Sequence, residues 1–429
     1  MTLDDSLILH ASKPADRSYL SVSALKLYAE DPYRFYLTRV LGLKEPSTTA
    51  LVLGSALHEA MEVFFRTQSV RAAGEALCNY VASNFHTLDE PVIRVNVDQP
   101  HNPRDKSEVE VNAGTLAELG LEVLLPVLQW MESRPEEYEW VAAQASPPQA
   151  VERPLGQLSR EAGLPYTIMS VYDHRKSRTS RLPVSVLAGV PFHGYVDAVL
   201  EVNGSRMILD HKLVSSIVAY YPARGGWVSY GPRYDPAEDL QLDIYSAATG
   251  IYQAGFQFFS KFPQYFPPDK PLHSSWMDYR IWKNNPDPKF LPYICAELDG
   301  FVRYVLVWRP EIPFSSVANE IKQRAFNKIR DLSEQLTESF ILLKDGVEPE
   351  IAFPPGNPAD LHKKSCPFCV FRGDSCHVYM DREDIGESYL LHSRLTEQRE
   401  ILCGSHPQIQ ERRALWKQYR QDNAFATIS

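Results

Sequence analysis

The sequence lacks a surplus of positive charge. Its 44 lysines and arginines are outnumbered by 54 aspartates and glutamates, so the formal net charge is -10 at pH 7. A net negative charge does not attract nucleic acid to the protein surface as a whole. Any DNA or RNA that the protein binds must therefore meet a locally basic groove.

Long apolar runs and an N-terminal targeting signal are also missing. No stretch approaches the roughly 20 apolar residues that a membrane-spanning helix requires. The first residues, MTLDDSLILH, contain no basic region followed by an apolar one. We therefore expect a soluble cytoplasmic protein without a membrane partner. No GxxxxGKS or GxxxxGKT phosphate loop occurs, which argues against a helicase motor in the chain.

Cysteine is scarce and unevenly spread. Only six cysteines occur in 429 residues, and three of them crowd into a short stretch as Cys366, Cys369 and Cys376. This pattern predicts reduced thiols and a metal site rather than a disulfide framework. Thiolates at this spacing can wrap one soft centre, either Zn²⁺ or an iron–sulfur cluster.

The composition is otherwise that of a globular protein. Hydrophobic residues make up 44% and charged residues 23%, which is enough apolar material for a sizeable core. A serine cap at Ser21 precedes apolar residues at helical spacing, and a second helical stretch is expected from near Gly54. A polar loop at 97–108 interrupts the helical pattern that follows. Further helices are expected at about 238–254 and 315–343.

Residues 194–212, GYVDAVLEVNGSRMILDHK, predict two strands joined by a turn at Asn203-Gly204. This dipeptide favours a two-residue type I′ turn because both of its residues tolerate positive φ. The turn fixes the register, so Asp197 is expected to face Asp210 across the hairpin. Val199 and Ile208 are apolar on the face of the acids, and Ala198, Leu200, Met207 and Leu209 are apolar on the opposite face. This predicts burial on both sides within the central sheet of an α/β protein.

Two facing carboxylates are unfavourable without a cation. Cβ atoms of a directly opposed pair lie about 4.5 to 5.5 Å apart, so Asp197 and Asp210 should repel each other and destabilise the sheet. A divalent cation would remove the repulsion, and oxygen ligands suit Mg²⁺ or Mn²⁺. Lys212 lies two residues beyond Asp210 and therefore on the same face. On spacing alone, a half-exposed hairpin with its acids in water is the alternative.

Further motifs occur in a fixed order around the hairpin. They are Gly54-Ser-Ala-Leu-His58 upstream and Gln241-Leu-Asp-Ile-Tyr245 downstream. With Gly194-Tyr-Val-Asp197 and Asp210-His-Lys212, they resemble the GxxxH, GxxD, DxK and QxxxY motifs of RecB-like nucleases, a branch of the PD-(D/E)XK superfamily that also includes CRISPR-adaptation and phage exonucleases. The resemblance implies an α/β fold with a restriction-endonuclease-like core, in which helices flank a central mixed sheet.

The resemblance also implies roles for the matched residues. His58, Asp197 and Asp210 would be ligands of Mg²⁺ or Mn²⁺, together with the main-chain carbonyl of His211. Lys212 would orient the attacking water and stabilise charge. Taken without the other motifs, His58 would be interpreted as an ordinary core histidine.

Three further residues are implied near this site. Gln241 and Tyr245 lie one helical turn apart and can face the site together, where they would hold the substrate backbone or support the metal ligands. Glu152 resembles an acidic position near the active site of such enzymes.

Cys366, Cys369 and Cys376 resemble the C-terminal cysteines of the iron–sulfur subgroup of these nucleases, and the residues from Ser21 onward resemble their opening helix. The fourth cysteine of that pattern is missing. In the iron–sulfur subgroup of these nucleases a cysteine precedes the proline of the opening helix, whereas here Asp31 precedes Pro32. Three outcomes stay open: an iron–sulfur cluster with Asp31 as a ligand, a zinc site completed by His362 or His377, or three unligated thiols.

The leading hypothesis is a metal-dependent DNA exonuclease that acts on single strands or duplex ends in DNA recombination, repair or phage- or CRISPR-type DNA processing. It is compatible with protein partners in a recombination or defence complex. Two alternatives are a nucleic-acid-binding scaffold subunit that retains the nuclease fold and a partner-dependent defence nuclease.

Four segments are expected along the chain. They are a flexible N-terminal tail at 1–18, a helical N-terminal part with the GxxxH motif at 19–149, the nuclease core with an aromatic-rich insertion at 150–345, and a C-terminal cysteine cluster with a helical tail at 346–429.

Overall fold

The structure of the protein is a computed structural model. It describes residues 19–40, 47–88, 91–95, 107–133, 136, 139–144, 148–173, 178–202, 204–214, 220–221, 226–227, 239–265, 293–298, 301–309 and 315–354. The predictions for the N-terminal tail, for the clustered cysteines and for the helical C-terminal tail lie outside these residues.

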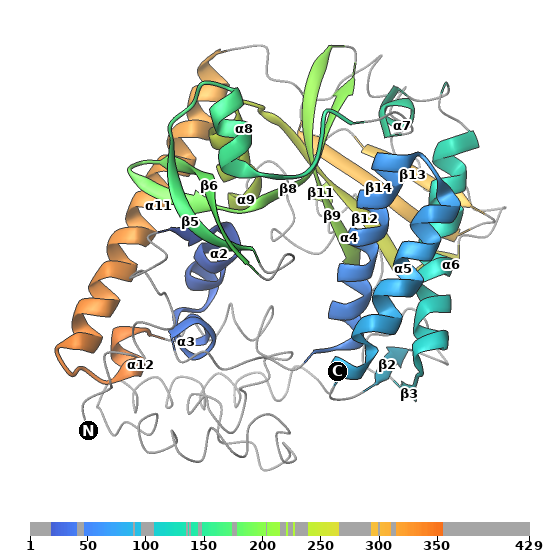
Figure 1. Ribbon diagram of the computed structural model, residues 1–429, viewed down its shortest axis with the longest axis horizontal. Coiled ribbons are helices and arrows are strands. Elements are labelled where there is room, and N and C mark those ends of the chain that lie inside the picture. The colour runs from blue at the N-terminus through green and yellow to red at the C-terminus, as the bar shows by residue number, and fades with distance from the viewer. Residues whose placement is uncertain are drawn as a thin grey trace.

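A six-stranded mixed sheet forms the centre of the fold (Figure 1). Its strand order is β13-β14-β12-β9-β8-β4, and the β9–β12 pair runs parallel while the other pairs run antiparallel. The strands are β4 (Ala150–Pro154), β8 (Tyr195–Val202), β9 (Ser205–Val214), β12 (Gln253–Tyr265), β13 (Tyr293–Leu298) and β14 (Phe301–Arg309). The expected α/β class with a central mixed sheet is confirmed.

A second sheet of four strands lies beside the first. Its order is β1-β7-β6-β5, with β1 parallel to β7 and the other neighbours antiparallel. These strands are β1 (Leu20–Ser21), β5 (Tyr166–Asp173), β6 (Arg178–Leu187) and β7 (Val190–His193). Two small hairpins complete the strands: β2 (Val92–Val95) with β3 (Ser107–Glu110), and β10 (Tyr220–Tyr221) with β11 (Gly226–Trp227).

Helices cover both faces of the central sheet. One face packs against α4 (Thr49–Thr67), α5 (Val70–Asn84), α6 (Ala113–Ser133) and α7 (Glu139–Gln144). The other packs against α2 (Val22–Glu30), α9 (Leu240–Thr249) and α11 (Ser315–Lys344). The shorter segments are α3 (Pro32–Phe35), a π-helical turn (Tyr36–Val40), a 3₁₀ turn (Phe85–Thr87), α8 (Leu155–Glu161) and α12 (Pro349–Ala352).

The β8–β9 hairpin has the register that the sequence predicts. Val202 pairs with Ser205, and the ladder continues outward to Ala198 and Leu209. Gly204 has φ 78°, the left-handed conformation that the predicted turn requires, whereas Asn203 lies outside the described residues. Because the register is fixed by the turn, the acids at the far end of the hairpin are fixed with it.

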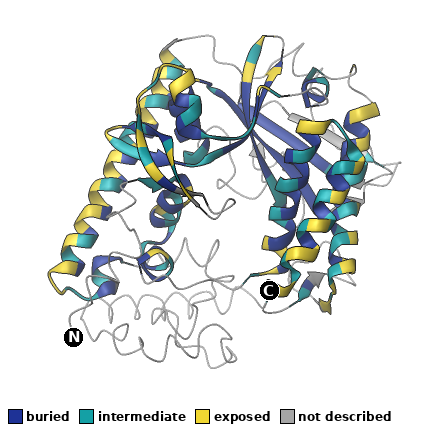
Figure 2. Ribbon diagram, in the orientation of Figure 1, coloured by how far each residue is buried: buried dark blue, intermediate teal, exposed yellow. Residues whose placement is uncertain are grey.

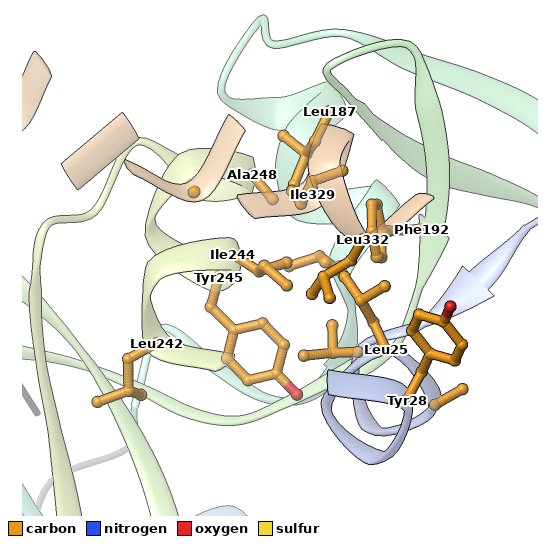
Figure 3. Close-up of a cluster of buried hydrophobic side chains, with 14 of the residues drawn as sticks. Leu25, Tyr28, Leu187, Phe192, Leu242, Ile244, Tyr245, Ala248, Ile329 and Leu332 are labelled. Carbon is orange, nitrogen blue, oxygen red and sulfur yellow. The ribbon is translucent and has the colours of Figure 1, made fainter. Parts of the chain in front are cut away.

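The hairpin is buried on both faces, as expected. Val199 and Ile208 join the apolar cluster under α9 and α11, and Ala198 and Leu209 join the cluster under α4, α5 and α6. Figure 2 shows these central strands as the most continuously buried part of the molecule. Figure 3 shows the first cluster, in which side chains from α2, α9 and α11 meet.

Two helix boundaries differ from those expected. Helix α4 begins at Thr49 rather than near Gly54, because the Thr48 hydroxyl caps it by accepting the Leu51 N–H at 3.2 Å. Helix α9 ends at Thr249 rather than near residue 254, because Gly250 takes a left-handed conformation with φ 73°. The chain then enters β12, so part of the aromatic-rich stretch belongs to the central sheet.

Candidate active site

Three acidic residues lie at one level across adjacent strands of the central sheet. They are Glu152 on β4, Asp197 on β8 and Asp210 on β9. Each register, continued by one residue, aligns these positions; the flanking pairs are Val151↔Ala198, Arg153↔Val196 and Ala198↔Leu209. Three carboxylates in a row repel one another in the absence of a cation.

The backbone is irregular at this level. Glu152 has φ 49°, a left-handed conformation that a glutamate rarely adopts and that is characteristic of functional sites. The Asp197 carboxylate accepts the main-chain N–H of His211 through Oδ2 at 2.8 Å. The hairpin ladder thus gives way to a side-chain contact where the acids face each other.

His58 reaches this row from helix α4. Its Nδ1 lies 3.3 Å from Oδ2 of Asp197, and its side chain is 30% exposed. His58, Glu152 and Asp197 offer ligand atoms that all lie within 4.8 Å of one another. One imidazole and two carboxylates at this spacing fit a divalent cation such as Mg²⁺ or Mn²⁺.

Asp210 is held from two sides. Gln241 Nε2 donates to Asp210 Oδ1 at 2.6 Å, and Lys212 Nζ forms an ion pair with Asp210 Oδ2. The same Gln241 amide donates to the Tyr245 hydroxyl oxygen at 3.3 Å, and that hydroxyl donates to the Tyr195 carbonyl at 2.9 Å. The structure therefore brings the residues of the DxK and QxxxY motifs into one hydrogen-bonded group.

Tyr245 is protonated in this environment. Burial raises its pKa well above the usual value, and the negative charges of Asp210 and Asp197 raise it further. A phenol that keeps its proton can donate to the Tyr195 carbonyl and still accept from Gln241. The side chain therefore fixes α9 to the start of β8.

The start of α9 is fixed by two residues that the sequence analysis missed. Asp239 caps the helix by accepting the Gln241 N–H at 2.8 Å and the Leu242 N–H at 3.1 Å. Lys26 of α2 reaches the same carboxylate at 2.9 Å. The cap could have been found, because aspartate is a preferred N-cap residue. Its pairing with Lys26 depends on the tertiary fold.

A buried ion cluster fixes the side of α9 away from the acidic row. Asp243, which is 2% exposed, accepts from Arg309 of β14 at 2.7 Å and from Arg324 of α11 at 2.6 Å. Arg309 also donates to the Leu242 carbonyl at 3.1 Å. Asp243 lies inside the QxxxY motif, but nothing in the sequence pattern distinguishes it from an exposed helical acid.

The His211 side chain lies on the opposite face of β9 from Asp210. It is 2% exposed, its ring centroid lies 5.6 Å from that of His58, and it stacks on Phe65 at 5.8 Å. Burial lowers the pKa of His211 to about 3, with a further lowering by the charge of His58. The imidazole is therefore neutral at physiological pH and packs from β9 against helix α4, where it contacts His58 and Phe65.

The lowered pKa of His211 makes stability depend on pH. The unfolded chain takes up a proton on this histidine near pH 6.5, whereas the folded chain does so only near pH 3. Stability should therefore fall as pH decreases through this interval, by up to about 1.4 kcal/mol per pH unit from this group. In His211→Leu the fall between about pH 6 and 5 should be less steep by that amount, measured by urea unfolding in EDTA. An unchanged slope would show that His211 is protonated in the folded protein.

Comparison with known proteins identifies the family. The chain matches the sequence profile of the PD-(D/E)XK nuclease superfamily over residues 19–373. It therefore belongs to the PD-(D/E)XK nuclease superfamily, whose members are metal-dependent nucleases, and membership implies DNA as the substrate. No curated protein matches the chain.

Asp31 has a local structural role in the fold. Asp31, considered as a cluster ligand, is buried and caps α3 by accepting the Arg34 N–H at 3.1 Å. Cys366, Cys369 and Cys376 lie outside the described residues.

Among the described helices, none combines the length and apolarity needed to cross a bilayer.

Proposed function

We propose that the protein is a RecB-like DNA exonuclease that hydrolyses phosphodiester bonds with Mg²⁺ or Mn²⁺. One observation carries the proposal: His58, Glu152 and Asp197 converge within 4.8 Å, and Asp197 faces the Asp210–Lys212–Gln241 group. An isolated acidic patch would not combine an imidazole, a lysine and aligned carboxylates in a half-buried position. The order of the motifs supports the RecB-like branch.

The proposed ligands are His58, Asp197, Asp210 and the main-chain carbonyl of His211. Glu152 is a further candidate, because its carboxylate lies in the same group as His58 and Asp197. A bound divalent cation supplies charge neutralisation at the scissile phosphate and a more acidic water. The convergence of carboxylate oxygens and one imidazole supports such a site.

The remaining residues act on the substrate and the attacking water. Lys212 Nζ lies beside Asp210 and carries a positive charge, so it can hold a water near the scissile phosphate and stabilise the charge that develops there. Gln241 holds the Asp210 carboxylate in place and, with Tyr245, can contact the substrate backbone. No covalent enzyme intermediate is required for this chemistry.

The decisive experiment uses end-labelled linear and covalently closed circular DNA, single- and double-stranded, with Mg²⁺, Mn²⁺ or EDTA. We expect degradation of linear DNA that is lost in EDTA and in Asp210→Ala. The control is Asp331→Ala, which removes an exposed aspartate of α11. Cleavage of circles would contradict the exonuclease assignment, and binding without any cleavage would favour a scaffold subunit.

Metal binding can be tested without DNA. Mn²⁺ at about 100 times its dissociation constant should stabilise the wild-type fold by about 2.7 kcal/mol, because only the folded chain assembles the site. Asp197→Asn and His58→Ala should abolish most of this stabilisation, measured as the Mn²⁺-dependent shift of thermal unfolding. Glu152→Gln decides whether Glu152 is a ligand. If the two first variants keep the full shift, the ion binds elsewhere.

A further inference from the structure

One segment of this acidic chain is free of acidic residues and rich in arginine. Residues 174–196 contain no aspartate or glutamate, although the whole chain holds 54 acids. The same segment contains Arg175, Lys176, Arg178 and Arg181. Its described part runs along β6 and β7 into the start of β8 and ends one residue before Asp197. This acid-free, basic stretch thus leads directly to the acidic row.

Part of this segment forms a projecting hairpin. Strands β5 and β6 pair from Tyr166↔Ser185 to Asp173↔Arg178, but β7 pairs with β6 only at residues 185–187. The pairs from Ile168↔Pro183 outward therefore extend past the β7 ladder, and we call them the arm. At about 3.3 Å per residue the arm is roughly 17 Å long. In the view of Figure 1 its far end projects between α2 and α4.

The base of the arm is fixed to the candidate site. Helix α8 approaches so closely that a Cβ on Gly156 would lie 2.2 Å from the Pro183 carbonyl oxygen, which only glycine allows. The neighbouring residue of α8, Leu155, donates its main-chain N–H to the Gly194 carbonyl at 2.8 Å. Tyr245 then holds the adjacent Tyr195 carbonyl. Backbone contacts thus connect the arm to the residues just before Asp197.

The arm carries charge of the sign that a nucleic acid needs. Arg181 is exposed and has no ion-pair partner among the residues that the structure describes, and its cross-strand neighbour Ser170 is also exposed. Arg178 occupies the last described position of the arm, opposite Asp173, its only acid. An exposed arginine with no acidic partner in the described part of the chain, in a protein of net charge -10, is suited to bind a phosphate.

We propose that the arm binds the phosphate backbone of the DNA strand that enters the active site, with the exposed Arg181 as its main contact. This inference rests on the proposed nuclease function and specifies how the substrate is held. One strand of duplex DNA presents a phosphate for about every 3.4 Å of helix axis, so the arm matches the axial length of roughly five phosphates. The contacts are to phosphates, which makes them independent of base sequence. They provide the local positive field that the whole surface lacks.

The test measures binding separately from cleavage. In an Asp210→Ala background with EDTA, the affinity for a fluorescent single-stranded 30-mer is measured by anisotropy at several salt concentrations. Arg178→Glu/Arg181→Glu should weaken binding by about 10-fold to 100-fold and reduce the salt slope by about 0.7 for each phosphate contact that is lost, which is the value for a single strand. The control is Lys328→Glu/Lys344→Glu, which makes the same change of net charge on exposed lysines of α11. Circular dichroism and thermal unfolding verify that both double variants fold.

Each outcome has a distinct meaning. An equal affinity loss in both double variants would show only a general charge effect and would overturn the arm proposal. An unchanged salt slope in the arm variant would overturn it as well and would point to an acidic protein partner for these arginines. If the wild-type chain cleaves no DNA, the nuclease proposal fails, but the anisotropy comparison still decides whether the arm binds DNA.

Discussion

Asp210→Ala should reduce kcat/KM for linear DNA by at least about 10³-fold, which corresponds to about 4 kcal/mol of transition-state stabilisation. The carboxylate is 2% exposed, receives the Gln241 amide and pairs with Lys212. Its loss would remove a proposed metal ligand and the partner that orients the lysine. Steady-state kinetics on a 5′-labelled single strand measures the effect, with Asp331→Ala as the control for loss of an exposed acid.

Gln241→Ala provides a graded comparison. Gln241 contacts Asp210 at 2.6 Å, so its loss should affect activity through the position of the carboxylate. Removing such an outer partner of a metal ligand typically costs 10-fold to 100-fold, so Gln241→Ala should retain clearly more activity than Asp210→Ala. The opposite order would mean that Gln241, rather than Asp210, is the more important contact with the substrate or the metal.

Loss of activity in Asp210→Ala should not result from unfolding. Removing Asp210 deprives Lys212 of its partner, but it also relieves repulsion from the facing Asp197. These effects oppose each other, so the free energy of unfolding in EDTA should stay within about 2 kcal/mol of the wild-type value. A larger destabilisation would mean that the Asp210 contacts hold the sheet together and would weaken the catalytic interpretation of the variant.

The hairpin could be predicted from sequence because its information is local. The Asn203-Gly204 turn sets the register, and a one-residue shift would expose every apolar side chain of one face. Asp197 and Asp210 therefore had one available alignment, and the structure has it. The approach of His58 to Asp197 was expected only from the motif order, because α4 and β8 are distant in the chain.

The supports of the site were not predictable in the same way. Two of these supports are ion pairs between ordinary charged residues that lie far apart in the sequence: Lys26 with Asp239, and Asp243 with Arg309. Each pair forms only because α2, α9 and β14 are packed around one apolar cluster. No local pattern distinguishes such partners from solvated surface charges. Strand β12 was missed for another reason: its aromatic residues suit an insertion as well as a buried strand.

Asp243→Ala should have the largest effect on stability, about 3 to 5 kcal/mol of destabilisation. Asp243 and Arg309 are 2% and 4% exposed at their side chains. Burial lowers the pKa of Arg309, and Asp243 opposes that shift by stabilising the guanidinium charge. Without Asp243 the arginine would remain buried and charged without its carboxylate. Urea unfolding at pH 7 measures the difference.

The same cluster contains its own control. Arg324 also contacts Asp243, but its side chain is 47% exposed, so water can replace much of what Arg324→Ala removes, and that variant should lose less than about 1 kcal/mol. In Asp243→Leu/Arg309→Met the buried charge is removed together with its partner, and much of the stability should return. If Asp243→Ala itself remained within about 1 kcal/mol of wild type, the pair would be solvated in solution. Helix α9, with Gln241 and Tyr245, would then owe its position to the Asp239 cap and the Tyr245–Tyr195 contact instead.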